Sequence, residues 1–238
     1  MIPSSPTTTA RVAGLLYLLV ALVAPFSMMY VPSVILVPGD AMATASHLVA
    51  SESLFRLGLL GDASVVLLEV VLTAVLYAVL RPAGRTLALV ATFARLGMTV
   101  VQGVNLIPSL AALELMSGAP YLSGLDAGQA EALALFALQL HAQSVHVWEV
   151  FFGLHCFIVA ALVFRSGYFP RVFGPLMALA ALAYSANGVG NLLVPESAPM
   201  LASFVGIAAI AGELPFVFWL LIKGVDEKRW HAAEASSR

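Results

Sequence analysis

The chain has 238 residues, of which 61% are hydrophobic and only 10% are charged, whereas an ordinary soluble domain has about 25% charged residues. A soluble protein of this size needs more polar surface than a chain with a mean hydropathy of +0.98 supplies. The formal net charge of −2 provides no basic field that would attract nucleic acid. A single cysteine, Cys156, excludes an intramolecular disulfide. We therefore expect a protein that lies in a lipid bilayer.

Six apolar runs are long enough to cross a bilayer, which takes about 20 residues. Turn signals rich in Pro, Gly and Arg, such as the segment 81–85, separate them. The runs cover residues 12–31, 54–80, 86–113, 134–164, 172–193 and 200–222. The sequence thus predicts an all-α, polytopic transmembrane bundle of six spans. We expect residues 1–225 to form one domain and residues 226–238 to form a flexible tail.

The basic residues between the runs fall on one side of a six-span arrangement. They are Arg11, Arg81, Arg85, Arg165, Arg171, Lys223, Lys228, Arg229 and Arg238. The opposite loops carry Asp40, Glu52, Glu114, Asp126, Glu131 and Glu196. Because cytoplasmic loops contain the excess of Lys and Arg, we expect both termini to be cytoplasmic.

Capping residues extend two of the helices beyond the length that a span requires. Asp40 is placed to cap a helix that starts at Ala41, and Asp126 with Gln129 has the spacing of a capping box. Helices that start there reach roughly 55 to 60 Å at 1.5 Å per residue, about twice the hydrocarbon thickness. We therefore expect amphipathic extracellular extensions before spans two and four, which project, kink or break.

Several short segments of the chain resemble those of a known family. They are VPGDA at 37–41, SLFRLG at 53–58, LRP at 80–82, FFGLHC at 151–156, FRSGYFPR at 164–171 and GEL at 212–214. Together they resemble the bacterial family called domain of unknown function 4386. The resemblance implies a multi-pass protein of the bacterial plasma (inner) membrane. It brings no established reaction, substrate or cofactor.

Ionisable residues occur inside the predicted spans, where they normally face protein or water and have partners. Counting about 1.5 Å per residue from the cytoplasmic ends places an inner group roughly 14 to 16 Å deep. This group consists of Glu69, Arg95, Glu213 and His155. A second, outer layer lies about 20 to 27 Å up by the same count, and it consists of Asp62, Gln102, Asn105, His146 and Glu149. The two layers are arranged to form one polar path open towards the outside.

The inner group has a functional and a structural interpretation. In a carrier or sensor for a small molecule, an ion or a lipid, Arg95 holds an anionic group while Glu69 or Glu213 titrates. In a structural or partner-binding bundle, Arg95 pairs with either carboxylate to fix helix register, and His155 is a satisfied core residue. Small-residue stripes mark helix-contact faces, which a homo-oligomer is able to use. They are Gly174, Ala178, Ala181, Ser185 and Gly188 in span five, and Ala202, Gly206 and Ala209 in span six.

An alternative from another class is a membrane-embedded enzyme with zinc or iron held by Asp62, His146 and Glu149 near the outer face. The His-x-x-Glu spacing is weak support, because it arises often by chance. We expect no cofactor otherwise. Haem is not expected, since His141 and His155 share one face but no partner helix supplies further ligands.

Further motifs that would bring a cofactor or a nucleophile are missing from the sequence. It has no nucleophile elbow and no Gly-rich phosphate loop. The only lysines, Lys223 and Lys228, lie at or beyond the cytoplasmic boundary, which excludes a retinal-type Schiff base. The bilayer is the expected partner. Pro25, Pro108 and Pro215 are expected to kink their helices.

Overall fold

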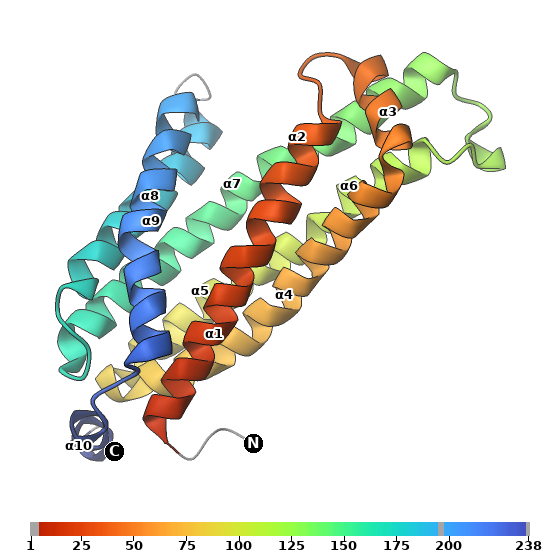
Figure 1. Cartoon of the computed structure of the whole chain (residues 1–238). Helices are drawn as coiled ribbons and strands as arrows, with labels where there is room; N and C mark the ends of the chain where they lie inside the picture. The colour runs from red at the N-terminus through yellow and green to blue at the C-terminus, as the bar shows by residue number, and fades with distance from the viewer. Residues whose placement is uncertain (1–4, 195–197, 237–238) are drawn as a thin grey trace. The chain divides into compact units, whose positions relative to one another are not determined.

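The computed structural model describes residues 5–194 and 198–236. These residues form helices and the turns between them, and none of them forms a strand. The helices are α1 (Pro6–Pro25), α2 (Val31–Ile35), α3 (Ala41–Ala50), α4 (Glu52–Leu80), α5 (Arg85–Val104), α6 (Leu106–Leu115), α7 (Ala127–Ser166), α8 (Phe173–Leu193), α9 (Ala198–Ile222) and α10 (Glu227–Ser236) (Figure 1). A π-helical segment, η1 (Phe26–Tyr30), joins α1 to α2. Two 3₁₀ turns, η2 (Arg81–Ala83) and η3 (Pro120–Leu122), lie in connections.

Six candidate membrane spans occur in the described part of the chain, as the apolar runs predicted. They are Pro6–Ile35, Glu52–Ala83, Arg85–Leu115, Ala127–Ser166, Phe173–Leu193 and Met200–Ile222. Each is long and apolar enough to cross a hydrocarbon core of about 30 Å. The chain is therefore an all-helical, multi-pass membrane protein whose apolar helix surfaces contact lipid.

The two predicted caps are present and start helices where the sequence placed them. Asp40 Oδ1 accepts a hydrogen bond from the backbone N–H of Ala43 at 2.9 Å. Asp126 and Gln129 form a reciprocal capping box, with N–O distances of 2.8 and 3.1 Å. The first extension is a separate helix, α3, which ends before α4 begins, whereas the second belongs to the unbroken 40-residue α7.

The three prolines have different effects on their helices. Pro25 ends α1, and the π-helical η1 follows directly. Pro108 lacks the N–H that would bond to the carbonyl of Val104, and the helix is interrupted next to that carbonyl, at Asn105 between α5 and α6. Pro215 lies within a continuous α9. A π-helical segment thus follows Pro25 and an interruption precedes Pro108, whereas α9 continues through Pro215.

The contacts within the chain divide it into two compact units. Unit 1 comprises residues Met1–Leu19, Leu68–Thr99 and His146–Arg238, and unit 2 comprises Val20–Leu67 and Val100–Val145. Each unit has its own apolar core. That of unit 1 includes Leu72, Met98, Cys156 and Phe216, and that of unit 2 includes Ile35, Leu48 and Ala134.

Glycines allow the helices of unit 1 to pack closely. A Cβ at Gly188 of α8 would lie 2.7 Å from the carbonyl oxygen of His146, and one at Gly153 of α7 would lie 3.0 Å from the backbone nitrogen of Ser185. Figure 1 shows α8 beside α9, where Gly212 approaches the carbonyl of Leu176 in the same way. The stripe of span five therefore contacts α7 of its own chain. In span six, a Cβ at Gly206 meets no atom of the described residues within 4 Å, and the side chain of Ala209 lies outside the described part.

The described end of the chain is helical. Residues 227–236 form α10, and Trp230 of this helix is buried. The indole N–H of Trp230 and the hydroxyl of Tyr168 both donate to the carbonyl of Val79, each at 3.0 Å. Arg81 pairs with Glu234 at 2.5 Å. The tail sequence is polar, but the buried ring of Trp230 bonds to a carbonyl at the end of α4. This contact stabilises α10.

Candidate functional site

Arg95 is the centre of a buried polar cluster in unit 1. It lies on α5 with none of its surface exposed. Its Nε and Nη2 both lie 2.7 Å from Glu69 Oε2 on α4. Its Nη1 donates to the hydroxyl of Tyr17 on α1 at 2.7 Å and to Nε2 of His155 on α7 at 3.0 Å. Four helices thus supply the cluster, which includes three of the four residues predicted for the inner group.

The imidazole of His155 is held from both sides. Its Nδ1 lies 2.9 Å from the carbonyl oxygen of Ala91, which is an acceptor, so Nδ1 has the proton. Its Nε2 is then free to accept from Arg95. The ring also stacks on Phe152, with centroids 5.9 Å apart. His155 is therefore a neutral, satisfied residue of the core, as the structural interpretation predicted.

Protein groups surround the guanidinium of Arg95, and its Nε and Nη1 make hydrogen bonds to them. Nε and Nη2 converge on one carboxylate oxygen instead of forming a two-oxygen fork, and Nη2 is close to Glu69 without good hydrogen-bond geometry. The ring of Tyr17 lies 4.7 Å from the guanidinium carbon. An anion would have to displace one of these partners to reach Arg95.

Glu213 does not pair with Arg95 within the described residues, although the sequence placed both at one depth. Its Oε1 instead accepts a hydrogen bond from the hydroxyl of Tyr184 on α8 at 2.8 Å. The Tyr184 ring packs edge-on against Phe152, with centroids 4.7 Å apart, and against Trp148 at 6.1 Å. These aromatic contacts fix the hydroxyl that faces the carboxyl group of Glu213.

Two residues of the predicted outer layer lie together in unit 1. Glu149 Oε2 is 3.0 Å from His146 Nδ1, one helical turn away. Asn187 Nδ2 on α8 donates to both oxygens of Glu149, at 2.7 and 2.8 Å. Asn191 Nδ2 in turn donates to Asn187 Oδ1 at 3.0 Å. The result is a chain of polar side chains along the contact between α7 and α8.

The other three residues of that layer belong to unit 2. Asp62 and Asn105 are buried, and Oδ1 of each lacks a hydrogen-bond partner among the described residues. Asn105 Nδ2 donates to the carbonyl of His141 at 2.9 Å, and His141 Nδ1 lies 2.7 Å from the carbonyl of Asn105. Gln102 Nε2 is 3.6 Å from the sulfur of Met28. The predicted layer is thus divided between the two units.

The described residues contain no group of three or more His, Cys, Asp or Glu side chains placed to hold a metal ion. Of the predicted zinc or iron ligands, Asp62 belongs to unit 2, while His146 and Glu149 belong to unit 1. Both ring nitrogens of His155 have partners in the protein.

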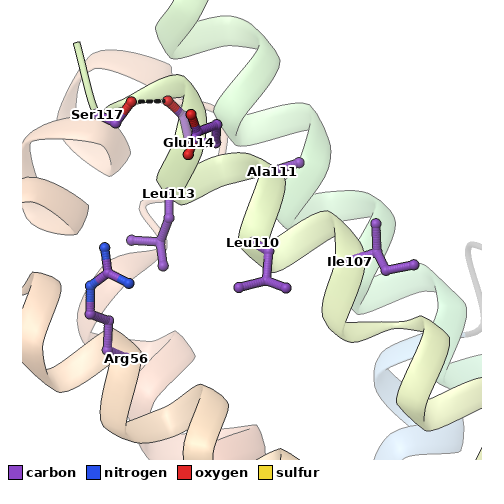
Figure 2. A pocket seen from close by; sticks show the side chains of 7 residues that line it. All are labelled: Arg56, Ile107, Leu110, Ala111, Leu113, Glu114 and Ser117. Carbon is purple, nitrogen blue, oxygen red and sulfur yellow. Dashed lines mark hydrogen bonds between the residues drawn. The ribbon is translucent and has the colours of Figure 1, made fainter. Parts of the chain in front are cut away.

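A separate pocket of about 380 Å³ lies in unit 2 between α4 and α6. Figure 2 shows the residues that line it, which are Arg56, Ile107, Leu110, Ala111, Leu113, Glu114 and Ser117. Arg56 pairs with Glu52 at 2.7 Å, and Glu114 accepts from the hydroxyl of Tyr121 at 2.5 Å. None of the predicted site residues lines this pocket, and its apolar wall includes the exposed side chains of Ile107 and Leu110.

Comparison with known proteins establishes the family of the chain but no activity. The model of DUF4386, a domain of unknown function, matches residues 12–224, so the chain belongs to this family. An uncharacterized protein of Archaeoglobus fulgidus is 35% identical over 80 residues, which are 32% of this chain and 43% of that protein. The chain thus matches less than half of that relative's length. No solved structure shows significant similarity to the chain.

Sequence reasoning missed three partners in the site, which are Tyr17, Tyr184 and the amide of Asn187. The two tyrosines lie in apolar runs and were counted as apolar. Their signal was available, because a buried tyrosine hydroxyl usually has a hydrogen-bond partner. Asn187 lies in the fifth apolar run, directly before Gly188 of the small-residue stripe.

Proposed function

We propose that this protein is a carrier or sensor of the bacterial inner membrane that binds a proton or another small cation within the bilayer. In this proposal, Glu213 is the group that binds the ion. The Arg95–Glu69 pair is a fixed element of the site and not the part that binds the ligand. The proposal thereby assigns to Glu213 the ligand-binding role that the sequence alone suggested for Arg95.

The distribution of charge among the helices of unit 1 supports this proposal. The guanidinium of Arg95 is neutralised by Glu69 at 2.7 Å. Glu213, in a candidate span, has the neutral hydroxyl of Tyr184 as its hydrogen-bond partner. A carboxylate away from water without a cation is strongly disfavoured. Glu213 therefore needs a proton or a bound cation, and this single observation carries the proposal.

The neighbours of Glu213 suit reversible ion binding. Tyr184 donates to Oε1, which leaves Oε2 for an incoming ion. The rings of Phe152 and Trp148 hold Tyr184 in place, so the site keeps its shape whether or not the ion is bound. Pro215 follows Glu213 by two residues and leaves the carbonyl of Ala211 without its helical N–H donor. That carbonyl is a further oxygen available to a cation.

Infrared difference spectroscopy tests the proposal on the full-length protein in lipid nanodiscs. Spectra between acidic and alkaline buffer are expected to contain the C=O stretch of a protonated carboxyl group. Glu213→Gln should remove that band, and Tyr184→Phe should shift its frequency because the hydrogen bond to the carboxyl is lost. Glu131→Gln, on α7 in unit 2, is the matched control and should leave the band unchanged.

Proton flux into vesicles distinguishes a carrier from a sensor. A membrane potential is applied to vesicles that contain the protein and a trapped pH-sensitive dye. A carrier should acidify the lumen of these vesicles, and Glu213→Gln should abolish the acidification. If the infrared band is absent, or if it persists in the Glu213→Gln variant, then Glu213 is not the ion-binding group. The structural bundle becomes the better description in that case.

We also propose that both termini face the cytoplasm. The even number of candidate spans supports a common side for the two termini. The position of the basic residues supports the cytoplasm as that side. Arg238 and the acidic Glu196 of the opposite loops lie outside the described residues. The two ends of the described chain also meet within unit 1, where Thr7 Oγ1 donates to the carbonyl of Val225 at 3.1 Å and Arg11 Nη2 to that of Ile222 at 3.1 Å.

A further inference from the structure

Unit 2 contains two buried side-chain oxygen atoms that have no hydrogen-bond donor in the described part of the chain. They are Oδ1 of Asp62, a residue that is 5% exposed, and Oδ1 of Asn105, a residue that is 8% exposed. The two other buried side-chain atoms without partners in the described residues, Arg95 Nη2 and Trp219 Nε1, are donors in unit 1. A buried acceptor without a donor costs about 1 to 3 kcal/mol, and more when it is charged. Within the described residues, neither of these two Oδ1 atoms accepts a hydrogen bond.

The helices change their geometry next to these oxygens. Ser27 belongs to the π-helical η1 and packs against Gly61, where a Cβ would lie 3.0 Å from that of Ser27. The hydroxyl of Ser27 lies beside the Asp62 carboxyl and is only weakly engaged, at 3.4 Å from the carbonyls of Val23 and Ala24. π-Helical segments concentrate at functional sites, and interrupted helices expose oxygens that bind Na⁺ or protons in membrane proteins.

His141 connects Asn105 to the same site. The two reciprocal hydrogen bonds between them use the amide nitrogen of Asn105, at 2.9 Å, and the Nδ1 of His141, at 2.7 Å. The Asn105 amide is thus oriented by its nitrogen, which leaves Oδ1 without a partner. His141 is also a neighbour of Asp62, and Ser27 is a second polar neighbour, from η1.

From this arrangement we propose that unit 2 binds a monovalent alkali cation at Asp62 Oδ1, with the hydroxyl of Ser27 and Oδ1 of Asn105 as neutral ligands. Carboxylate, hydroxyl and amide oxygens are hard ligands that suit such ions. The site provides one carboxylate, so a single positive charge neutralises it. A divalent or transition metal requires more charged ligands, and the described residues contain no such group. The site shares no residue with Glu213 and extends beyond the proposed function.

Thermal unfolding of the full-length protein in nanodiscs tests the cation site. Unfolding is followed in NaCl, KCl, LiCl and choline chloride at equal ionic strength. One alkali cation should raise the melting temperature to a saturating value that choline does not reach, because a ligand that binds only the folded state stabilises it. Asp62→Asn should abolish this dependence. Ser27→Ala and Asn105→Ala should each raise the half-saturating concentration about tenfold, the effect of one lost polar contact.

Asp126→Asn is the matched control, since it removes an exposed carboxylate of unit 2 while asparagine still caps α7. The melting temperature of Asp126→Asn should depend on the cation as that of the unsubstituted protein does. The same result is expected for Glu213→Gln, and it would show that this site is independent of the proposed function. If alkali cations and choline give the same melting temperature, the proposal is wrong, whatever the variants do. It is also wrong if the dependence survives in Asp62→Asn, or if only pH and not the identity of the cation shifts unfolding. If Asp62→Asn does not fold, the two alanine variants decide, and an unchanged half-saturating concentration in both contradicts the proposal.

Discussion

Each ionisable residue within the spans has an environment that sets what it is able to do. Arg95 is enclosed by a carboxylate, a phenol and an imidazole. Glu213 accepts a hydrogen bond from one neutral hydroxyl, and one oxygen of Asp62 has no donor among the described residues. Residues that look equivalent in the sequence therefore differ in their surroundings. Our proposals give the ion-paired guanidinium of Arg95 a role in stability and the carboxyl groups of Glu213 and Asp62 a role in ion binding.

At this scale we expect the loss of Arg95 to be severe. Arg95→Gln leaves Glu69 without its cation and deprives Tyr17 and His155 of a donor. Removing one partner of a buried ion pair costs about 3 to 5 kcal/mol. Arg56→Gln is the control, because its pair with Glu52 is exposed and such pairs contribute about 0 to 1 kcal/mol. Chemical unfolding in mixed micelles measures both.

The double variant Arg95→Gln with Glu69→Gln completes this test. Removing both charges avoids an isolated carboxylate, so the double variant should lose less stability than the sum of the two single variants. Equal losses in Arg95→Gln and Arg56→Gln would show that the buried pair adds nothing to the stability of the bundle.

At the scale of the elements, close helix contacts and the C-terminal helix determine the shape of unit 1. The approach of α8 to α7 depends on glycines whose missing side chains leave room for backbone atoms. Helix α10 contacts both the residue before α1 and the turn after α7. Arg229 of α10 donates to the carbonyl of Gly167 at 3.0 Å, and the hydroxyl of Ser5 donates to Glu227.

Substitution of two glycines tests the helix contacts. A Cβ at Gly188 would lie 2.7 Å from the carbonyl of His146, so Gly188→Ala should cost about 1 to 3 kcal/mol as the helices move apart. Gly206→Ala is the control, because a Cβ there meets no described atom within 4 Å. It should be neutral or stabilising by up to about 1 kcal/mol through helix propensity. Melting temperatures of the two variants in nanodiscs give the comparison, and equal values contradict the close packing.

The attachment of α10 should depend on pH. The hydroxyls of Ser5 and Thr7 lower the pKa of Glu227 below its ordinary value. A depressed pKa in the folded state gives stability that is present above the unfolded pKa and is lost as the pH falls through the folded value. Hydrogen exchange of residues 227–236 should therefore become faster in acid, below the usual range for glutamate. In Ser5→Ala this change should begin at a higher pH. Exchange that does not depend on pH in this way contradicts the contribution of Glu227.

At the scale of the whole molecule, the chain combines six candidate spans with two separately packed units. Each unit encloses polar side chains within an otherwise apolar set of helices. The proposed proton or cation site of Glu213 lies in unit 1, and the proposed alkali cation site of Asp62 lies in unit 2. The two sites are thus open to independent tests on one protein.

Labelling of single cysteines tests the proposed orientation. In a Cys156→Ala background, Ser123→Cys lies in an exposed connection before α7 and Ser236→Cys at the exposed end of α10. A membrane-impermeant maleimide should label the first in intact spheroplasts and the second only after permeabilisation. The reverse pattern would place the C-terminus outside, and labelling of both in intact spheroplasts would contradict the three candidate spans that separate the two positions.

The sequence alone determined the class of protein and the limits of its spans. A run of apolar residues has to be about 20 residues long to cross a bilayer, so the six predicted runs agree with the candidate spans to within a few residues at most ends. The caps at Asp40 and Asp126 were equally accessible, because capping depends on residues three positions apart. The polar residues of the inner group were predicted from their depth.

Only the tertiary structure decided which of those residues meet. Depth along a helix does not fix the direction in which a side chain points relative to other helices, so Arg95 pairs with Glu69 and Glu213 bonds to Tyr184. The two units, the buried ring of Trp230 and the unpaired oxygens of Asp62 and Asn105 likewise follow from packing between segments far apart in the chain. Local periodicity specifies helices, whereas the partners of a buried charge depend on contacts that no single segment contains.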